Sequence, residues 1–359
     1  MLISAFITHK KAEHYSDCQD RFSINPDTKS IALSDGMSQS IFQKIWAEIL
    51  VNTFTSNEEW VPNIENVKAL STIWRNNVEE NIKAQKESGN KSVWRAERSL
   101  IDGHSAGATF LGIRFKGLNW DCDVLGDSCL ILVNDNQIKA IYSSEEVSSF
   151  DNYPDFFDSN SKKDGKGKPR NINGLLVPGD SLLMVSDPFS DYLLKHKGSK
   201  EESKLIDRLL GINSHSEFEE VVEELRQKGM HNDDSTLIIV KQDGNELFTY
   251  SPIPDDIYNL IEKEKSETLR SQTETSVNPT SKVNCQEEIS DEASVSAPES
   301  KEVQWEQYCL NTLKEELRIL LMKEILGWKD KALKKRNNKQ KLENYIQDII
   351  NIFKRNLNN

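Results

Sequence analysis

Aspartates that adjoin predicted strands are the residues of this sequence best suited to chemistry. The clearest pair follows the apolar run at residues 181–185, which ends in Asp187, Pro188 and Asp191. An aspartate after a strand is usually only a turn former. Here the same arrangement recurs at four other places in the chain. The full set is Asp20, Asp35, Asp127, Asp187, Asp191 and Asp233.

These carboxylates predict a metal site made of oxygen ligands. Hard oxygen ligands without His or Cys suit Mg²⁺ or Mn²⁺ rather than zinc. Two such ions a few Å apart lower the pKa of a shared water and screen an anionic substrate. The pattern therefore favours hydrolysis of a phosphate ester, and the sequence offers no obvious Ser-His-Asp or Cys-based nucleophile in its place.

Short strands and amphipathic helices must position these aspartates. Strand-like runs precede or follow each of them, and the buried run 181–185 is one example. A helical apolar stripe follows Asp35 at residues 41–50, and a second helix is expected at about residues 63–86. Residues 151–173 are polar and are expected to form a long mobile loop. Two further helices are predicted at about residues 200–210 and 217–227.

The composition narrows the class of protein. The chain has 359 residues and a net charge of −13, which is a poor basis for binding nucleic acid. The basic run at residues 329–341 is better interpreted as a solvated stretch. No apolar stretch approaches the length of about 18 residues that a membrane span needs, and no signal peptide is evident. The five cysteines form no CxxC pair, so the expected location is the reducing cytoplasm.

Three regions are expected along the chain. Residues 1–250 should form a catalytic domain. Residues 251–304 are polar and contain no aromatic residue between Tyr258 and Trp305, so a disordered linker is expected. Residues 305–359 should form a helical hairpin, whose two apolar stripes within residues 305–356 predict binding to a partner protein or self-association. Deletion of residues 260–359 is then expected to leave catalysis nearly unchanged.

Six motifs occur in a fixed order along residues 1 to about 245. They are Q-D-R-F (19–22), S-D-G (34–36), G-A-T (107–109), L-G-D-S (125–128), P-G-D-S-L-L-M-V-S-D-x-x-x-D (178–191) and D-D-S-T-L-I-I-V (233–240). The set resembles the metal-dependent, type 2C protein serine/threonine phosphatases (PPM family), in particular bacterial members. No single motif is specific, but the ordered set of six is.

The resemblance implies a fold and an activity. The fold is α+β, a four-layer α-β-β-α sandwich of two antiparallel sheets, here with an added C-terminal helical segment. The activity is hydrolysis of phosphoserine and phosphothreonine esters at a binuclear Mn²⁺ or Mg²⁺ centre. The implied partners are a phosphoprotein substrate and a cognate serine/threonine kinase or that kinase's target.

The resemblance also implies roles for individual residues. Asp35 and Asp187 are the central catalytic pair. Asp20, Asp35, Asp187 and Asp233 would bind the two core ions, with the backbone carbonyl of Gly36. Asp127, Asp187 and Asp191 match the positions that hold a weaker third ion.

The sequence departs from the family pattern at several positions near the site. Gln19 stands where an acidic residue is usual, and Pro188 stands where Gly usually follows the metal-binding aspartate. The family's phosphate-binding arginine before Arg21 is missing. Lys10, Lys11 and His14 are candidates to replace it, although a solvated surface role is expected for each. His104 is expected to be an ordinary loop histidine.

These departures leave a second hypothesis open. In it, the phosphatase-like domain is catalytically weak and serves as a binding or scaffold module, docking a partner through its C-terminal helices. Retention of the metal-binding aspartates favours the enzyme, whereas the missing arginine and Pro188 favour the scaffold.

Overall fold

The computed structural model describes residues 1–90, 93–144, 154–244, 247–250 and 253–275. All of these residues belong to the compact unit Met1–Pro279. The predicted helical segment 305–359 lies outside the described residues, as does most of the predicted linker.

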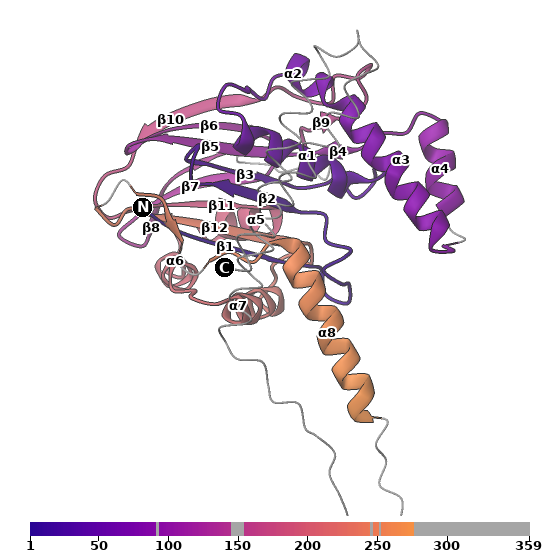
Figure 1. Cartoon of the computed structure of the whole chain (residues 1–359). Coiled ribbons are helices and arrows are strands. Elements are labelled where there is room, and N and C mark those ends of the chain that lie inside the picture. Colours follow the sequence, from indigo (N-terminus) through magenta and orange to yellow (C-terminus); the bar gives the residue numbers. More distant parts are fainter. Residues whose placement is uncertain (91–92, 145–153, 245–246, 251–252, 276–359) are drawn as a thin grey trace, which may run out of the picture. The chain divides into compact units, whose positions relative to one another are not determined.

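Two sheets form the centre of this unit (Figure 1). Every strand pair is antiparallel except β1 with β13. The six-stranded sheet has the order β13 (Thr249–Tyr250), β1 (Leu2–Thr8), β12 (Ser235–Lys241), β11 (Asp180–Val185), β7 (Cys129–Asn134) and β8 (Gln137–Tyr142). The five-stranded sheet has the order β10 (Arg170–Leu175), β6 (Asn119–Leu125), β5 (Phe110–Lys116), β3 (Ser30–Ser34) and β2 (Arg21–Asn25). A small third sheet pairs β4 (Gly107–Ala108) with β9 (Phe157–Asp158).

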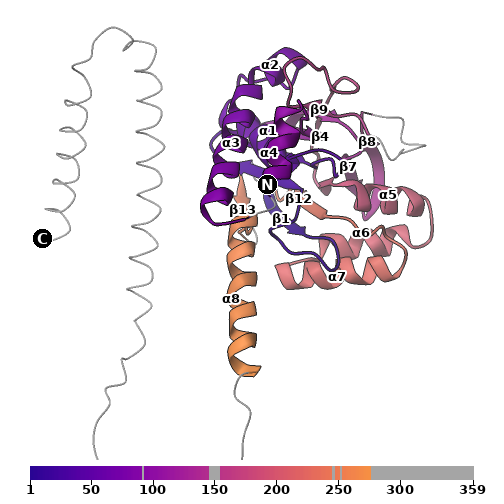
Figure 2. The same ribbon diagram turned by 90° about the vertical axis from the view of Figure 1, so that its right-hand side faces the viewer.

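Helices cover the outer face of each sheet (Figures 1 and 2). The five-stranded sheet packs against α1, α3 and their neighbours, and the six-stranded sheet packs against α5, α6 and α7. The helices are α1 (Gln43–Ser56), α2 (Ile64–Ala69), α3 (Ser71–Glu87), α4 (Val93–Ile101), α5 (Asp187–His196), α6 (Glu202–Leu210), α7 (His215–Gln227) and α8 (Ile257–Thr275).

Alternation along the strands explains the layers, because successive side chains of a strand point to opposite faces. In β11, Leu182 and Met184 pack in the core between the sheets. Their neighbours Leu183 and Val185 pack under α5, α6 and α7. A third core lies between the five-stranded sheet and α1 to α4, around Trp46. Three apolar cores separated by two sheets confirm the predicted four-layer α-β-β-α sandwich.

Some elements differ from the sequence-based expectation. The helix expected over residues 63–86 is two helices, α2 and α3, separated at Leu70. Helix α4 was not predicted. The described part of the expected mobile loop 151–173 contains β9 and the start of β10, because backbone pairing with β4 and β6 orders a polar sequence.

The expected linker 251–304 also needs correction, because its first part forms helix α8 (Figure 2). The side chains of Ile257 and Leu260 are buried against Tyr15 and Cys18, and this packing stabilises the start of the helix. The composition of the segment conceals these two apolar residues among many polar ones. Deletion from residue 260 would therefore remove part of the folded unit, and the survival of hydrolysis after that deletion stays a prediction.

Candidate functional site

The ends of several strands line one pocket, which has a volume of about 460 Å³. Asp35 follows β3, Asp127 follows β6 and Asp233 precedes β12. Asp187 follows β11 and is the first residue of α5, and Asp191 lies one turn later. All five of these aspartates line the pocket, together with Gly36. Segments that are far apart in the sequence thus deliver the predicted carboxylates to one place.

Asp187 begins a helix rather than the turn that the sequence predicted. Strand β11 ends at Val185, and Pro188 lies in the first turn of α5. A proline fits there because the first backbone N–H groups of a helix have no partner within the helix. The helix then places Asp191 on the pocket beside Asp187.

Two glycines allow the close packing around the pocket. A side chain at Gly36 would come within 2.9 Å of Gln43 at the start of α1. Gly126 has a φ angle of +104°, which favours glycine, and turns the chain just before Asp127. Whether the carbonyl of Gly36 binds an ion stays a prediction.

Asp20 is fully buried and, unlike the other five predicted aspartates, does not line the pocket. Its Oδ2 atom accepts a hydrogen bond of 2.6 Å from the Thr236 hydroxyl. Its Oδ1 atom is buried without a hydrogen-bond partner, and so is Oδ1 of Asp187. Buried oxygens of this kind are costly unless another group satisfies them.

The carboxylates repel one another through their charges. Burial, followed by the charge of Asp234, raises the pKa of Asp20 to about 7. Burial also raises the pKa of Asp35, and the charges of Asp20 and Asp187 add to this effect. The pKa of Asp187 is raised by burial and then by the charges of Asp127 and Asp233. A divalent cation would relieve this repulsion.

The residues therefore fit a divalent metal centre in donor chemistry. All the candidate ligands are oxygens, and Asp20 and Asp187 each have a buried oxygen to offer. Even so, no three His, Cys, Asp or Glu side chains among the described residues form a ready metal cluster. Without a bound cation, repulsion between the negatively charged carboxylates favours keeping them apart. The carboxylates thus converge on the pocket without forming a closed set of ligands.

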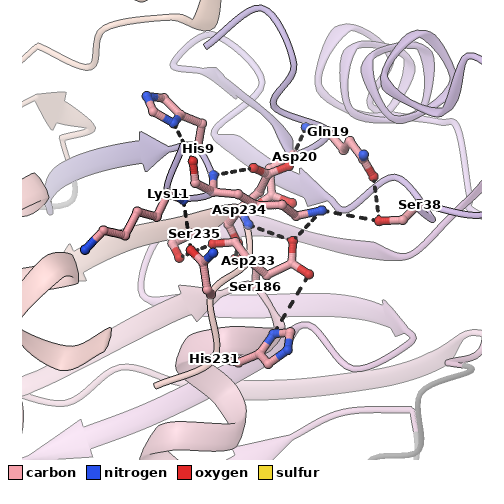
Figure 3. Close-up of polar contacts among 12 residues, drawn as sticks. His9, Lys11, Gln19, Asp20, Ser38, Ser186, His231, Asp233, Asp234 and Ser235 are labelled. Carbon is pink, nitrogen blue, oxygen red and sulfur yellow. Dashed lines mark hydrogen bonds and ion pairs between the residues drawn. The ribbon is translucent and has the colours of Figure 1, made fainter. Parts of the chain in front are cut away.

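Asp233 and Asp234 have different surroundings although they are adjacent. Asp233 lines the pocket, as predicted, and forms an ion pair of 2.9 Å with Lys10. Asp234 is buried and accepts hydrogen bonds from the backbone N–H groups of Lys10 and Gln19. Figure 3 shows this arrangement, together with the hydrogen bond of 3.0 Å between Gln19 and Ser38. Asp234 thus joins the two ends of the loop that carries Asp20.

The sequence did not predict that the Lys10 side chain would be mostly buried beside Asp233, nor that Lys195 and His231 would line the pocket. Lys10 was expected to be solvated, yet only 16% of its side chain is exposed, because Asp233 and Ser38 surround its ammonium group. His231 and Lys195 line the pocket, and Lys195 forms an ion pair of 2.6 Å with Asp191. The sequence patterns used to find the site were apolar runs and acidic residues, and neither pattern identifies basic residues at a pocket.

The other two candidates for the missing arginine lie away from the pocket. Lys11 is 65% exposed and pairs with Glu223 on α7. His14 is 70% exposed and pairs with Glu264 on α8. His104, which was expected to be an ordinary loop histidine, is also absent from the pocket lining.

Comparisons with known proteins add structural likenesses only. No family model matches the sequence, and no curated protein matches it. Among solved structures, the photosystem II phosphatase PBCP is 14% identical with a TM-score of 0.43, over 68% of this chain and 99% of that one. The S. agalactiae serine/threonine phosphatase is 17% identical with a TM-score of 0.43, over 67% and 99% of the two chains.

A third structure is the catalytic domain of the serine/threonine protein phosphatase PstP in complex with two manganese ions. It is 15% identical with a TM-score of 0.41, over 66% of this chain and 96% of that one. The chain is similar in structure to serine/threonine phosphatases. At these identities, the function must be inferred from the residues of the chain itself.

Proposed function

We propose that this protein is a metal-dependent protein serine/threonine phosphatase. The observation that supports this proposal most is the convergence of Asp35, Asp127, Asp187 and Asp233 on one pocket, together with the burial of Asp20. Asp20, Asp35 and Asp187 are buried carboxylates whose pKa values are raised by burial and by the charges of neighbouring aspartates. They suit a site that holds multiply charged cations.

The proposed ligands of the two core ions are Asp20, Asp35, Asp187 and Asp233, with the carbonyl of Gly36. Asp127, Asp187 and Asp191 would hold a third ion more weakly. When bound, Mn²⁺ or Mg²⁺ would supply an activated water and the positive charge that a phosphate ester requires.

The remaining groups at the pocket have supporting roles in this proposal. Thr109 accepts a hydrogen bond of 3.1 Å from the backbone N–H of Asp35 and so fixes the end of β3. Ser190 donates to the carbonyl of Asp127 at 2.8 Å and joins α5 to the β6–β7 turn. Lys195 and His231 offer positive or proton-donating groups to an anionic substrate at the rim of the pocket.

Substrate, partners and location remain proposals. We infer a phosphoserine or phosphothreonine protein as the substrate, and a cognate kinase or its target as the partner. The partner-binding segment 305–356 lies outside the described residues. No helix within the described ranges has the length and apolar character needed to cross a membrane. The cysteine pattern is the basis for proposing a cytoplasmic location.

Hydrolysis of p-nitrophenyl phosphate and of a phosphothreonine peptide, measured against Mn²⁺ concentration, tests the proposal. Asp35→Asn and Asp187→Asn should abolish Mn²⁺-dependent hydrolysis, because each removes a ligand and a charge. Asp121→Asn is a matched control, because Asp121 is exposed on β6 and does not line the pocket. Wild-type turnover in both pocket variants would refute the assignment of the site. A wild type without activity or metal binding would favour the scaffold hypothesis.

A further inference from the structure

Lys10 is held against the aspartate pocket by its own backbone. The backbone N–H of Lys10 donates to Asp234 at 2.9 Å, and that of Lys11 donates to the side chain of Asn232 at 2.8 Å. The guanidinium of Arg226 also bridges the carbonyls of His9 and Asp233, at 3.0 and 2.8 Å. The segment after β1 is thus fixed to the segment before β12, with Lys10 at the junction.

The ammonium group of Lys10 forms an ion pair with one carboxylate oxygen of Asp233, which is a proposed metal ligand. It lies 2.9 Å from Oδ1 of Asp233 and donates to the Ser38 hydroxyl at 3.3 Å. The backbone N–H of Asp234 also donates to Asp233 Oδ1, at 2.7 Å. The other oxygen, Oδ2, is approached by His231 at 4.0 Å (Figure 3). A divalent ion at Asp233 would therefore compete with the Lys10 ammonium group, which already forms an ion pair with this carboxylate.

The electrostatic surroundings of Lys10 are consistent with this competition. Burial by itself would lower the pKa of Lys10, but the hydrogen bond to Asp233 and the charges of Asp233 and Asp234 raise it above the ordinary value. Lys10 is therefore cationic at every pH at which the protein would work. Its charge also lowers the pKa of Asp187, so its effect extends across the pocket.

We propose that Lys10 competes with a divalent cation for Asp233 and so weakens one of the two core metal sites. This inference rests on the proposed function, because it assigns Asp233 to a metal centre. An ion that binds there must displace the ammonium group or accept a like charge beside it, and either costs free energy. The other core site, around Asp20, Asp35 and Asp187, is not opposed by an ion pair of this kind.

Titration of the full-length, chelator-treated protein with Mn²⁺ in a calorimeter tests the proposal directly. Lys10→Met keeps the length of the side chain and removes its charge. We expect the weaker of the two core Mn²⁺ sites to tighten by roughly tenfold, as expected for loss of a competing ion pair that is only partly exposed. Lys11→Met is the matched control, because Lys11 pairs with Glu223 away from the pocket, and it should leave both affinities unchanged.

A double-mutant cycle with Asp233→Asn separates competition from a structural effect. If Lys10 acts through Asp233, Lys10→Met should not tighten Mn²⁺ binding in the Asp233→Asn background. Thermal melting with and without Mn²⁺ provides the second readout and shows whether each variant folds. Lys10→Gln replaces Lys10→Met if the latter does not fold.

The outcomes distinguish this inference from the proposed function. Unchanged or weaker Mn²⁺ binding by a folded Lys10→Met protein, with normal binding by the wild type, overturns the role of Lys10 alone. Mn²⁺ binding that is detected in the Lys10→Met protein but not in the wild type supports the role of Lys10. Absence of Mn²⁺ binding in both proteins overturns both proposals.

Discussion

Asparagine at position 20 should stabilise the metal-free protein at alkaline pH. Asp20 is fully buried, and its pKa is raised from 3.8 to about 7 by burial and by the charge of Asp234. Between these two values the folded protein binds a proton that the unfolded chain has lost, so stability falls as pH rises. A difference of about three pKa units corresponds to about 4 kcal/mol of lost stability at pH 8.

Asp20→Asn removes this cost while keeping an oxygen that can accept the hydrogen bond from Thr236. In the presence of a chelator, we expect the variant to melt on the order of 10 °C higher than the wild type at pH 8. The difference should shrink as pH is lowered toward 4, where the carboxyl is protonated in the folded protein and partly protonated in the unfolded chain. Saturating Mn²⁺ should reverse the order, because only the wild type keeps the ligand.

Thermal melting of both proteins from pH 4 to pH 8, with chelator or Mn²⁺, checks this prediction. Parallel pH profiles of the two metal-free proteins would refute the idea that Asp20 is a buried, strained charge. A wild type that Mn²⁺ does not stabilise would show that the carboxylate serves some other purpose.

Three further results are expected. Asp35→Asn and Asp187→Asn should each reduce Mn²⁺-dependent turnover to background while the metal-free fold remains, as activity assays and melting curves would show. Asp191→Ala should lower turnover and raise the Mn²⁺ concentration required, since a weakly held third ion loses a carboxylate; identical metal titrations of the two proteins would contradict this. Deletion of residues 276–359 should leave hydrolysis of a small phosphate ester nearly unchanged. Deletion of residues 256–359 should lower the melting temperature, because it removes the buried side chains of Ile257 and Leu260. Equal melting temperatures of the two truncated proteins would contradict the packing role of α8.

Local patterns were sufficient to predict much of the fold and most of the site. Apolar runs of strand length, each followed by an aspartate, identified the ends of β3, β6 and β11. The resemblance to the phosphatase family that the ordered motifs carry then implied a two-sheet architecture, which the three separate cores confirm. These features could be predicted because each depends on residues close together in the sequence.

The features that sequence reasoning missed depend on distant partners. Lys10 appeared to be a surface residue because its partner, Asp233, lies more than 220 residues away in the sequence. Helix α8 was hidden in a segment of polar composition, and the packing of Ile257 and Leu260 against Tyr15 and Cys18 explains its order. Helix α5 was missed because Pro188 was interpreted as the end of an element rather than as part of a first helical turn.

The strand order also has a consequence for how the protein folds during synthesis. The first strand, β1, pairs only with β12 and β13 among the described strands, and β12 ends at Lys241. Until β12 has left the ribosome, β1 has no hydrogen-bonded neighbour in its sheet among the described strands. Pairings this distant in sequence form slowly and late. The loop that carries Asp20 is anchored to the same late segment through Asp234, so the pocket is completed only when the segment that begins β12 arrives.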